Sequence, residues 1–382
     1  MIYLDAAATT PVRPEVLQAM WPVLSGTYGN PSSHHEVGEA ARAALEDARR
    51  RVAAVLGCRP AEVLFTSGGT EADNAGLKGI ALARRARDPE RDRVVVGAVE
   101  HPAVLESADF LARVHGFSVD VAPVDGLGVV DPDAFRALLS ERTAVVSVMY
   151  ANNEVGTVQD VASLAAAARE AGVPFHTDAV QAGGALPLSV KDLGVDALSL
   201  SGHKLGAPKG NGALFLKSRT PFEALIHGGG QQRGRRSGTE DVAGAVAFAT
   251  ALGLAEAERL SGGAALAARR DRFVAAVLDA APGALLTGHP ERRLPGSASF
   301  CFPGVSGETV LLELERRGIV CSSGSACAAG STEPSAVLTA MGIAAEVAQT
   351  AVRFSLQSGT RQEDLDVVAR SVGEILGRFA PA

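Results

Sequence analysis

One lysine stands out among the residues that could act as an amine nucleophile. Only five of the 36 basic residues in this 382-residue chain are lysines, and an arginine keeps its proton and cannot serve this purpose. Lys204 follows an apolar run at 197–200 and ends a polar turn, Ser201-Gly202-His203-Lys204. In a parallel sheet, chemistry is presented where a strand ends. We therefore expect Lys204 to hold an aldehyde cofactor as a Schiff base, although such a tetrapeptide by itself is more often a surface turn.

A carboxylate follows another apolar run. Asp178 comes after residues 173–176, about one helix and one strand before Lys204. A pyridine-type cofactor withdraws electrons only while its ring nitrogen is protonated, and a carboxylate in a water-poor site favours that state. Asp178 is suited to this pairing. The alternative is an aspartate that caps a helix beginning at Ala179.

Other polar residues follow further apolar runs and could surround the same cofactor. Gly69 and Thr70 would let backbone N–H groups approach a phosphate at a helix N-terminus, although a tight turn with a threonine cap is more common. Ser201 and His203 could donate to that phosphate. His101 could stack on the ring, or it could cap a helix.

Two neutral amides complete the set. Gln181 and Asn152 offer donors to a phenolic oxygen or to a substrate, and either could be merely structural. Such residues at successive strand ends are harder to explain by structure alone than any single member is.

The second chemical centre is a cysteine in a loop of small residues. Cys327 lies within residues 322–331, which are serine, glycine, alanine and cysteine only. A loop without bulky side chains can swing, as a nucleophile must if it visits one place and delivers to another. Cys321 and Cys327 could instead bind a metal, but no histidine lies nearby and zinc ligands are usually closer in sequence. Cys58, Cys301 and Cys321 are most simply structural thiols.

The elements that must position these residues alternate along the chain. Short apolar runs alternate with helical segments between residues 63 and 204, which indicates a parallel sheet covered by helices on both faces. Because ligands of such a sheet gather at the carboxyl ends of its strands, five of these ends would converge on one crevice.

The rest of the chain predicts a smaller α+β unit. Alanine-rich helical sequence runs from Asp241 to about Leu260, and strands follow at 297–302 and 352–356. We expect an α/β protein with a large domain built on a mostly parallel sheet and a smaller α+β domain. The expected boundaries are 1–14 for an N-terminal segment packing with the small domain, 15–255 for the large domain and 256–382 for the small domain, which carries the cysteine loop.

Composition excludes several classes of function. The formal net charge is −7 and 47% of the residues are hydrophobic, which favours small polar substrates over nucleic acid or an anionic membrane surface. No apolar run reaches the roughly 18 residues of a membrane helix, and the start lacks a secretory pattern. Four cysteines are too few for a disulfide framework in a chain of this size. We expect a cytoplasmic protein.

Taken together, the motifs resemble those of the cysteine desulfurases, which are pyridoxal-phosphate enzymes of the class V aminotransferase family that serve iron–sulfur cluster assembly. The resemblance covers nearly the whole chain, and the serine-rich cysteine loop is similar to the group I (NifS/IscS-like) branch rather than the SufS-like branch. It implies a fold-type I pyridoxal-phosphate-dependent transferase. In chain order, the matching motifs are Tyr3-Leu4-Asp5, Ala8-Thr9-Thr10-Pro11, Gly29-Asn30-Pro31, Thr66-Ser67-Gly68-Gly69-Thr70-Glu71, Glu100-His101, Asn152-Asn153-Glu154, Asp178-Ala179-Val180-Gln181, Ser201-Gly202-His203-Lys204, Arg236-Ser237-Gly238-Thr239 and Ser322-Ser323-Gly324-Ser325-Ala326-Cys327.

The resemblance assigns the cofactor ligands. It implies that Lys204 is the Schiff-base lysine, that Asp178 pairs with the pyridine nitrogen and that His101 stacks on the ring and moves protons. Gln181 would reach the phenolic oxygen of pyridoxal phosphate. The implied phosphate ligands are Gly69, Thr70, Ser201 and His203, joined by Thr239 from the partner subunit of a homodimer.

The resemblance also implies the substrate contacts and the reaction. Asn152 and Arg353 would hold the carboxylate of L-cysteine, Arg353 by a bidentate fork. Cys327 would take the sulfur as a persulfide and release alanine, and the sulfur would pass to an acceptor such as an iron–sulfur scaffold or a tRNA-thiolation protein. Ala328 and Ala329 depart from the hydroxyl residues that relatives often carry there.

Two other functions stay open at this point. Another class V enzyme, such as a selenocysteine lyase or an aminotransferase, would explain the lysine and the aspartate but would leave the cysteine loop with less to do. A non-catalytic sulfur scaffold or a nucleotide-binding protein is the third interpretation, and the lack of a GxGxxG turn after the first strand disfavours the nucleotide site.

Overall fold

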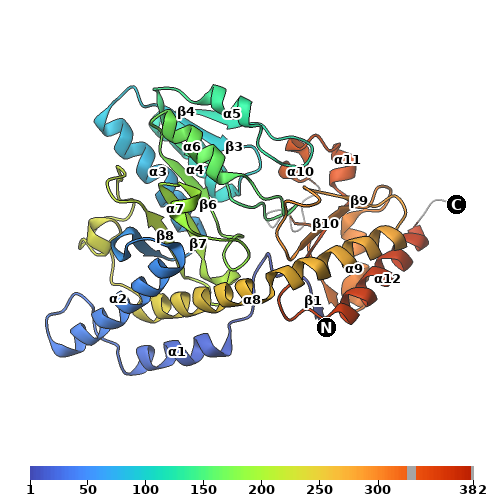
Figure 1. Ribbon diagram of the computed structural model, residues 1–382, viewed down its shortest axis with the longest axis horizontal. Helices are drawn as coiled ribbons and strands as arrows, with labels where there is room; N and C mark the ends of the chain where they lie inside the picture. The colour runs from blue at the N-terminus through green and yellow to red at the C-terminus, as the bar shows by residue number, and fades with distance from the viewer. Residues whose placement is uncertain (325–332, 380–382) are drawn as a thin grey trace.

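A seven-stranded sheet forms the larger part of the protein, and a second, smaller layer of strands and helices lies at the C-terminal side (Figure 1). The structure is a computed structural model, and it describes residues 1–324 and 333–379. The seven strands, in spatial order, are β2 (Val63–Thr66), β8 (Gly212–Leu216), β7 (Ala197–Ser201), β6 (Phe175–Asp178), β5 (Thr143–Ser147), β3 (Arg93–Gly97) and β4 (Ser118–Ala122).

The sheet is mostly parallel, as the sequence predicted. Strands β4, β3, β5, β6 and β7 pair in parallel, whereas β8 runs antiparallel to both β7 and β2. Strand β8 was not predicted from the sequence. Because β8 is antiparallel to both of its neighbours, β2 and β7 run in the same direction. The carboxyl ends of β2 and β7 therefore lie at the same edge of the sheet.

Helices cover both faces because the strand side chains alternate between them. Val94 and Val96 of β3 join one buried cluster with α3 (Gly69–Arg87) and α4 (Pro102–His115), whereas Val95 joins the cluster on the opposite face. The helices of that opposite face are α2 (Glu36–Leu56), α5 (Pro132–Leu138), α6 (Val161–Glu170), α7 (Val190–Leu193) and the first half of α8 (Val242–Ala280). Helix α1 (Pro14–Ser25) packs on α8.

Three short 3₁₀ turns connect these elements: η1 (Pro60–Glu62), η2 (Gly202–Lys204) and η3 (Gln232–Gly234). The turn η2 directly follows β7 and carries the lysine singled out above.

The smaller unit has its own core. Strands β9 (Leu285–Leu286), β10 (Ser297–Cys301) and β12 (Ala351–Ser355) pair antiparallel, and β1 (Ile2–Tyr3) pairs in parallel with β11 (Ile319–Val320). Phe273 and Phe354 meet edge to face with ring centres 5.3 Å apart inside this core. Helices α9 (Gly307–Arg316) and α12 (Gln362–Phe379) pack on this core, whereas α10 (Ala336–Ala340) and α11 (Ala345–Ala348) belong to a separate buried cluster that also includes residues of the larger part.

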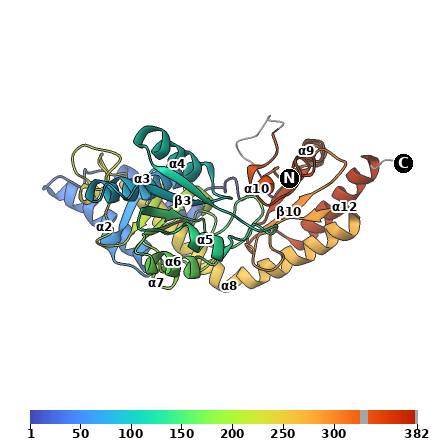
Figure 2. The ribbon, with the colours of Figure 1, turned by 90° about the horizontal axis from the view of Figure 1, so that it is seen from above.

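Helix α8 joins the two cores (Figure 2). Its 39 residues place Phe248 in the larger core and Phe273 in the smaller one. The predicted helix end near Leu260 is therefore wrong: the helix continues through Gly262 and Gly263, because two glycines weaken a helix without ending it when both ends are packed. The predicted boundary between 255 and 256 falls inside this helix, and the three-part division stays a prediction.

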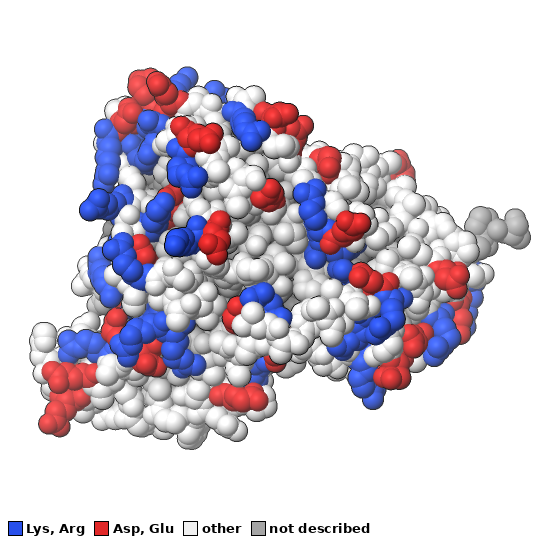
Figure 3. Space-filling model, in the orientation of Figure 1, with Lys and Arg blue, Asp and Glu red and all other residues white. Residues whose placement is uncertain are grey.

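Charged side chains of both signs are mixed on the face shown in Figure 3. No described helix is both long enough and apolar enough to cross a membrane.

Candidate active site

Three of the predicted residues lie together at the carboxyl edge of the large sheet. Asp178 ends β6, Lys204 ends the 3₁₀ turn after β7, and His101 follows β3 as the N-cap of α4. They are near enough that Asp178 raises the pKa of His101 and Lys204 lowers that of Asp178. Three of the five strand ends that were expected to converge are therefore close together.

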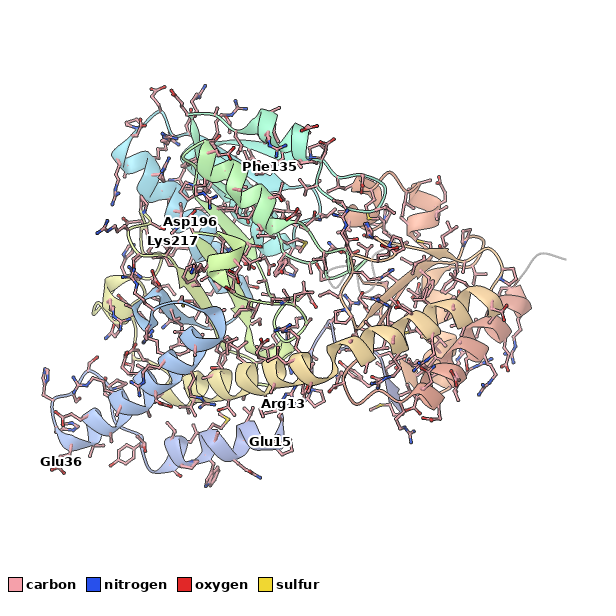
Figure 4. All side chains as sticks on the ribbon, viewed as in Figure 1. Arg13, Glu15, Glu36, Phe135, Asp196 and Lys217 are labelled. Atoms are coloured by element: carbon pink, nitrogen blue, oxygen red, sulfur yellow. The ribbon has the colours of Figure 1, made fainter. Side chains whose placement is uncertain are left out.

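The Lys204 side chain is half-buried, and its amine faces the N-terminal segment. It donates to the carbonyl oxygens of Ala7 and Ala8, the second at 2.7 Å. Burial, followed by the charge of Arg353, lowers its pKa to about 8. Lys217, by contrast, is half exposed and pairs with Asp196, Nζ to Oδ1 at 3.0 Å; the two residues are labelled in Figure 4. Lys204 is thus poised to lose its proton near neutral pH.

Asp178 is a buried carboxylate, and few hydrogen bonds offset its loss of hydration. Its Oδ1 accepts the N–H of Val180 at 2.8 Å, and no other hydrogen bond reaches the carboxylate from the described residues. Burial raises its pKa, whereas the Val180 N–H, His101 and Lys204 lower it. No helix begins at Ala179, where the chain forms turns instead, so the helix-cap alternative is wrong. A cation at the free side of this carboxylate would complete the site.

His101 does cap a helix. Its Nδ1 accepts the N–H of Ala103 at 3.1 Å, which leaves the proton of the neutral ring on Nε2. Burial lowers the pKa of His101, and Asp178 opposes that shift. The capping bond fixes the ring beside Asp178, and stacking on a cofactor stays a prediction.

The glycine turn and the end of β7 form a close-packed cradle. A Cβ placed on Gly69 would lie 2.7 Å from Val180 Cγ2 and 3.2 Å from Ser201 Cβ, so only glycine fits there. Thr70 is exposed in the first turn of α3. The predicted phosphate ligands Gly69 and Ser201 therefore do meet at a helix N-terminus.

The predicted phosphate ligands His203 and Thr239 have other surroundings in this structure. His203 is bonded through Nδ1 to Thr9 Oγ1 at 3.1 Å, and burial, then Lys204, lowers its pKa to about 4. Thr239 is exposed on the loop before α8. On that loop, Arg236 pairs with Glu71 of α3 at 3.0 Å.

The side-chain amides of Gln181 and Asn152 form hydrogen bonds with backbone groups. Gln181 donates from Nε2 to the Ala7 carbonyl at 3.0 Å. Asn152 is fully buried: its Oδ1 accepts the N–H groups of Glu154 and Val155, and its Nδ2 donates to the Val99 carbonyl at 2.9 Å. Asn152 thus shapes the loop after β5, and its contact with a substrate stays a prediction.

Arg353 joins three parts of the chain. Its Nη2 pairs with Asp5 Oδ1 at 2.7 Å and its Nη1 donates to the Asn153 carbonyl at 2.7 Å. A longer bond of 3.3 Å reaches the Gly324 carbonyl, and Nε has no partner among the described residues. A buried guanidinium with an unused donor is suited to an anionic substrate group.

Cys327 and its neighbours Ala328 and Ala329 lie outside the described residues. The other three cysteines are poor nucleophiles: burial raises the pKa of Cys58 and Cys321 to about 12 and that of Cys301 to about 11. Their interpretation as structural thiols fits these shifts, because the thiolate is the reactive form.

A cavity of about 370 Å³ reaches Lys204 from the side of the N-terminal segment. Its walls come from residues 6–14, α8 and the smaller sheet, and include Gln181 and Gln357. Arg13 lies on this wall beside α8, where it pairs with Glu258, Nη2 to Oε2 at 3.0 Å (Figure 4). His101 and Asp178 do not line it, so Lys204 stands between the cavity and the sheet edge.

Several polar residues around this site had no predicted role. Asp5, Asp73, Glu100 and His176 lie in contact with, or electrostatically close to, the predicted residues. For His176 a signal existed: it precedes Asp178 by two positions in a strand, and such residues share a face. For the others, nothing local to the sequence indicates which tertiary neighbours they meet.

Comparisons with known proteins agree with this geometry. Residues 2–368 match the family model described as aminotransferase class-V. The chain is 43% identical over 378 residues to cysteine desulfurase IscS of Methanosarcina thermophila, covering 99% of this chain and 92% of the relative. It is 44% identical over 383 residues to cysteine desulfurase NifS of Azotobacter vinelandii, covering 99% and 93%.

Solved structures give the same result. A NifS-like protein superposes with a TM-score of 0.91 at 36% identity over 99% of both chains. SspA, solved in complex with cysteine, superposes with a TM-score of 0.81 at 32% identity over 93% of this chain and 99% of SspA. With a family model matched over residues 2–368 and relatives above 40% identity, the chain belongs to the class-V aminotransferase family, among its IscS- and NifS-type cysteine desulfurases.

Proposed function

We propose that the protein is a pyridoxal-phosphate-dependent cysteine desulfurase that converts L-cysteine to L-alanine and transfers the sulfur to Cys327. The observation that carries the proposal is the proximity of a half-buried lysine, whose pKa is lowered to about 8, to the buried carboxylate Asp178 at one sheet edge. The names of the relatives supply the substrate, since they are cysteine desulfurases and SspA was solved with cysteine. They do not favour a selenocysteine lyase or an ordinary aminotransferase.

The residues present fit pyridoxal phosphate. No ion pair with Asp178 is formed by the described residues, and the protonated ring nitrogen would provide one. The Lys204 amine is the group that would hold the aldehyde carbon. Gly69 packs against Val180 and Ser201 at the N-terminus of α3, where backbone N–H groups would favour a phosphate. When bound, the cofactor supplies an electron sink for charge that develops on the substrate's α-carbon.

The protein's own groups would orient the substrate and move protons. Arg353 would hold the carboxylate of L-cysteine, with Asn152 shaping the adjacent loop. Near neutral pH, the Lys204 Nζ would accept the α-proton and return a proton to the product. The carbon–sulfur bond of the substrate would break as the Cys327 thiolate forms a sulfur–sulfur bond, which leaves a persulfide and releases alanine.

The remaining ligands and partners are part of the same proposal. His101 would stack on the ring, Gln181 would reach its phenolic oxygen, and Ser201 and His203 would bind the phosphate with Gly69 and Thr70. Thr239 would reach the phosphate of a partner subunit, in a homodimer. A cytoplasmic acceptor, such as an iron–sulfur scaffold or a tRNA-thiolation protein, would receive the sulfur.

The test supplies L-cysteine and a reductant to the loaded protein and measures alanine and sulfide. The wild type and Cys58→Ser should release both, Cys327→Ser should release neither above background, and Lys204→Ala should lack the visible absorbance of the wild type. No alanine from the wild type would overturn the activity. Equal release from wild type and Cys327→Ser would overturn only the role of Cys327.

A further inference from the structure

The loop that follows β5, residues 152–158, is joined to the smaller unit by backbone hydrogen bonds. The N–H of Leu294 donates to the Gly156 carbonyl at 2.8 Å, and the N–H of Val158 donates to the Arg292 carbonyl at 2.9 Å. Both partners lie in the segment between β9 and β10. The 152–158 loop therefore connects the larger part, which carries the strand ends of the site, with the smaller unit.

Arg293 fastens this loop with its side chain. The residue is 6% exposed, and its Nη2 donates to the Val155 carbonyl of the loop at 3.0 Å and to the Thr287 carbonyl after β9 at 3.2 Å. Its Nε donates to the carbonyl of Ser297, the first residue of β10, at 3.1 Å. One planar guanidinium thus ties the loop to both ends of the segment that joins β9 and β10.

The charge of Arg293 has no counter-ion nearby. No carboxylate of the described residues lies within ion-pair distance of it, and its buried Nη1 has no hydrogen-bond partner among them. Burial, followed by the charge of Arg270, lowers its pKa to about 10, and Asp271 opposes this shift. The side chain is therefore charged at neutral pH, at a cost in folding free energy. What an arginine provides here is several N–H donors in one plane, which no neutral side chain matches.

Two arginines of the smaller unit hold neighbouring carbonyls of the 152–158 loop. Arg293 holds the carbonyl of Val155, and Arg353 of β12 holds that of Asn153. Between these points the chain turns around the Asn152 side chain, whose Oδ1 accepts the N–H groups of residues 154 and 155. Loss of the Arg293 bond would release one side of this turn, and with it the position of Asn152 relative to Arg353.

We propose that Arg293 is a positioning residue that fixes Asn152 and Arg353, the two predicted ligands of the substrate carboxylate, relative to each other. It acts through the Val155 carbonyl and the turn, rather than on the substrate itself. This inference rests on the proposed function for the identity of the substrate, whereas the hold of Arg293 on the loop does not. Because a carboxylate contact is made before and during the reaction alike, its misplacement should weaken binding more than it slows the chemical step.

Arg293→Met tests the proposal in the loaded enzyme. The KM for L-cysteine should rise about tenfold and kcat should fall less than about threefold, because the substitution leaves Lys204 and Asp178 untouched. Arg292→Met removes the same charge one position earlier, where the exposed side chain contacts His289 and not the loop, and should leave both constants within about twofold of wild type. Equal KM values in the two variants, or a loss confined to kcat, would overturn the proposal.

A pair of glycines tests the same contact with Arg293 intact, and it also serves if Arg293→Met does not fold. A Cβ on Gly288 would lie 2.5 Å from the Val155 carbonyl oxygen, so Gly288→Ala must displace that carbonyl. Gly283→Ala is the matched control: φ is positive at both positions, 79° and 96°, but a Cβ on Gly283 meets no atom within 4 Å. Backbone strain is common to both variants, and only Gly288→Ala should raise KM, by about tenfold. An equal KM in both variants would contradict the role given to the Val155 carbonyl.

Hydrogen exchange of the full-length protein without substrate gives a readout that does not depend on the reaction. Peptides that cover 152–158 should exchange about tenfold faster in Arg293→Met, because the N–H groups of Glu154 and Val155 are bonded within the turn that Arg293 fastens. Arg292→Met should exchange as the wild type does. Unchanged exchange in Arg293→Met would show that the loop does not need this contact. Failure of the desulfurase assay would leave the exchange result unaffected, so the two proposals can fail separately.

Discussion

The chemistry of the site depends first on the ionisation of single side chains. Lys204, His101 and His203 are all half-buried, and the loss of solvation lowers the pKa of each. Arg353 pairs with Asp5 at 2.7 Å. The site thus places bases with lowered pKa values near one arginine, and Lys204 can give and take a proton as the pH passes about 8.

Attachment of pyridoxal phosphate to Lys204 should follow the ionisation of its amine. Because the neutral amine is the nucleophile and its pKa is lowered to about 8, the attachment rate of the cofactor-free protein should rise about tenfold per pH unit below pH 8 and level off above it. Stopped-flow absorbance in the visible measures this rate. A rate that keeps rising beyond pH 9 would indicate an ordinary lysine.

Arg353→Met should lower stability as well as substrate binding. It leaves the Asp5 carboxylate without its cation and frees the Asn153 carbonyl, which should reduce the free energy of unfolding in urea by about 2–4 kcal/mol. Arg361→Met removes an exposed ion pair with Asp364 and should change stability little. Equal effects of the two variants would show that burial of the Arg353 pair does not matter.

At the scale of elements, α8 and the strand ends decide how the site is assembled. Helix α8 packs with α1 and α2 at one end and with α12 at the other, so it holds the larger and smaller cores together. Gly262 and Gly263 lie between the two packed ends and line the cavity near Lys204. The N-terminal segment crosses the same region, with Leu4 in the smaller core.

Gly262→Ala should stabilise α8. A Cβ at this position meets no atom within 4 Å, so the change removes the cost of a helix glycine and should raise the free energy of unfolding by about 0.5–1 kcal/mol. Gly373→Ala in α12 is the matched control with the opposite sign, because its Cβ would lie 2.7 Å from the Ala280 carbonyl oxygen. Thermal unfolding of both variants measures the difference, and a loss of stability in Gly262→Ala would contradict the account.

At the scale of the whole molecule, one surface is unusually apolar for a free monomer. The outer side of α1 exposes Leu17, Trp21 and Leu24, with Trp21 69% accessible in the single chain. Contiguous exposed apolar groups mark interaction surfaces. The proposed homodimer would give this stripe a partner, and would bring Thr239 to the site of the second subunit.

Trp21 makes the dimer testable, because it is the only tryptophan in the sequence. If two copies cover α1, the fluorescence of Trp21 should resist acrylamide quenching, and sedimentation should give twice the chain mass of 39.1 kDa. Trp21→Ser should shift the mass toward the monomer. A monomeric wild type with freely quenched fluorescence would argue against the dimer, and a dimer with freely quenched Trp21 would place the interface elsewhere.

The sequence by itself determined the parallel part of the sheet and which residues end its strands, because a buried strand must be continuously apolar and must stop where polar residues begin. That logic placed Asp178, Lys204 and His101 at one edge. It also separated the cysteine in a loop of small residues from the three thiols that the structure buries fully or in part. The family resemblance, now supported by relatives of similar length, supplied the reaction.

Only the tertiary structure decided the rest. The length of α8 depends on packing at both of its ends, which overrides two glycines that weaken the helix locally. Strand β8 follows β7 closely in the sequence, but its antiparallel direction is set by its pairing with both β7 and β2. The partners of Lys204, the ion pair of Arg353 with Asp5 and the burial of Asp73 beside Asp178 join residues far apart in the chain. Their charges follow from distances and loss of water, which no local pattern encodes.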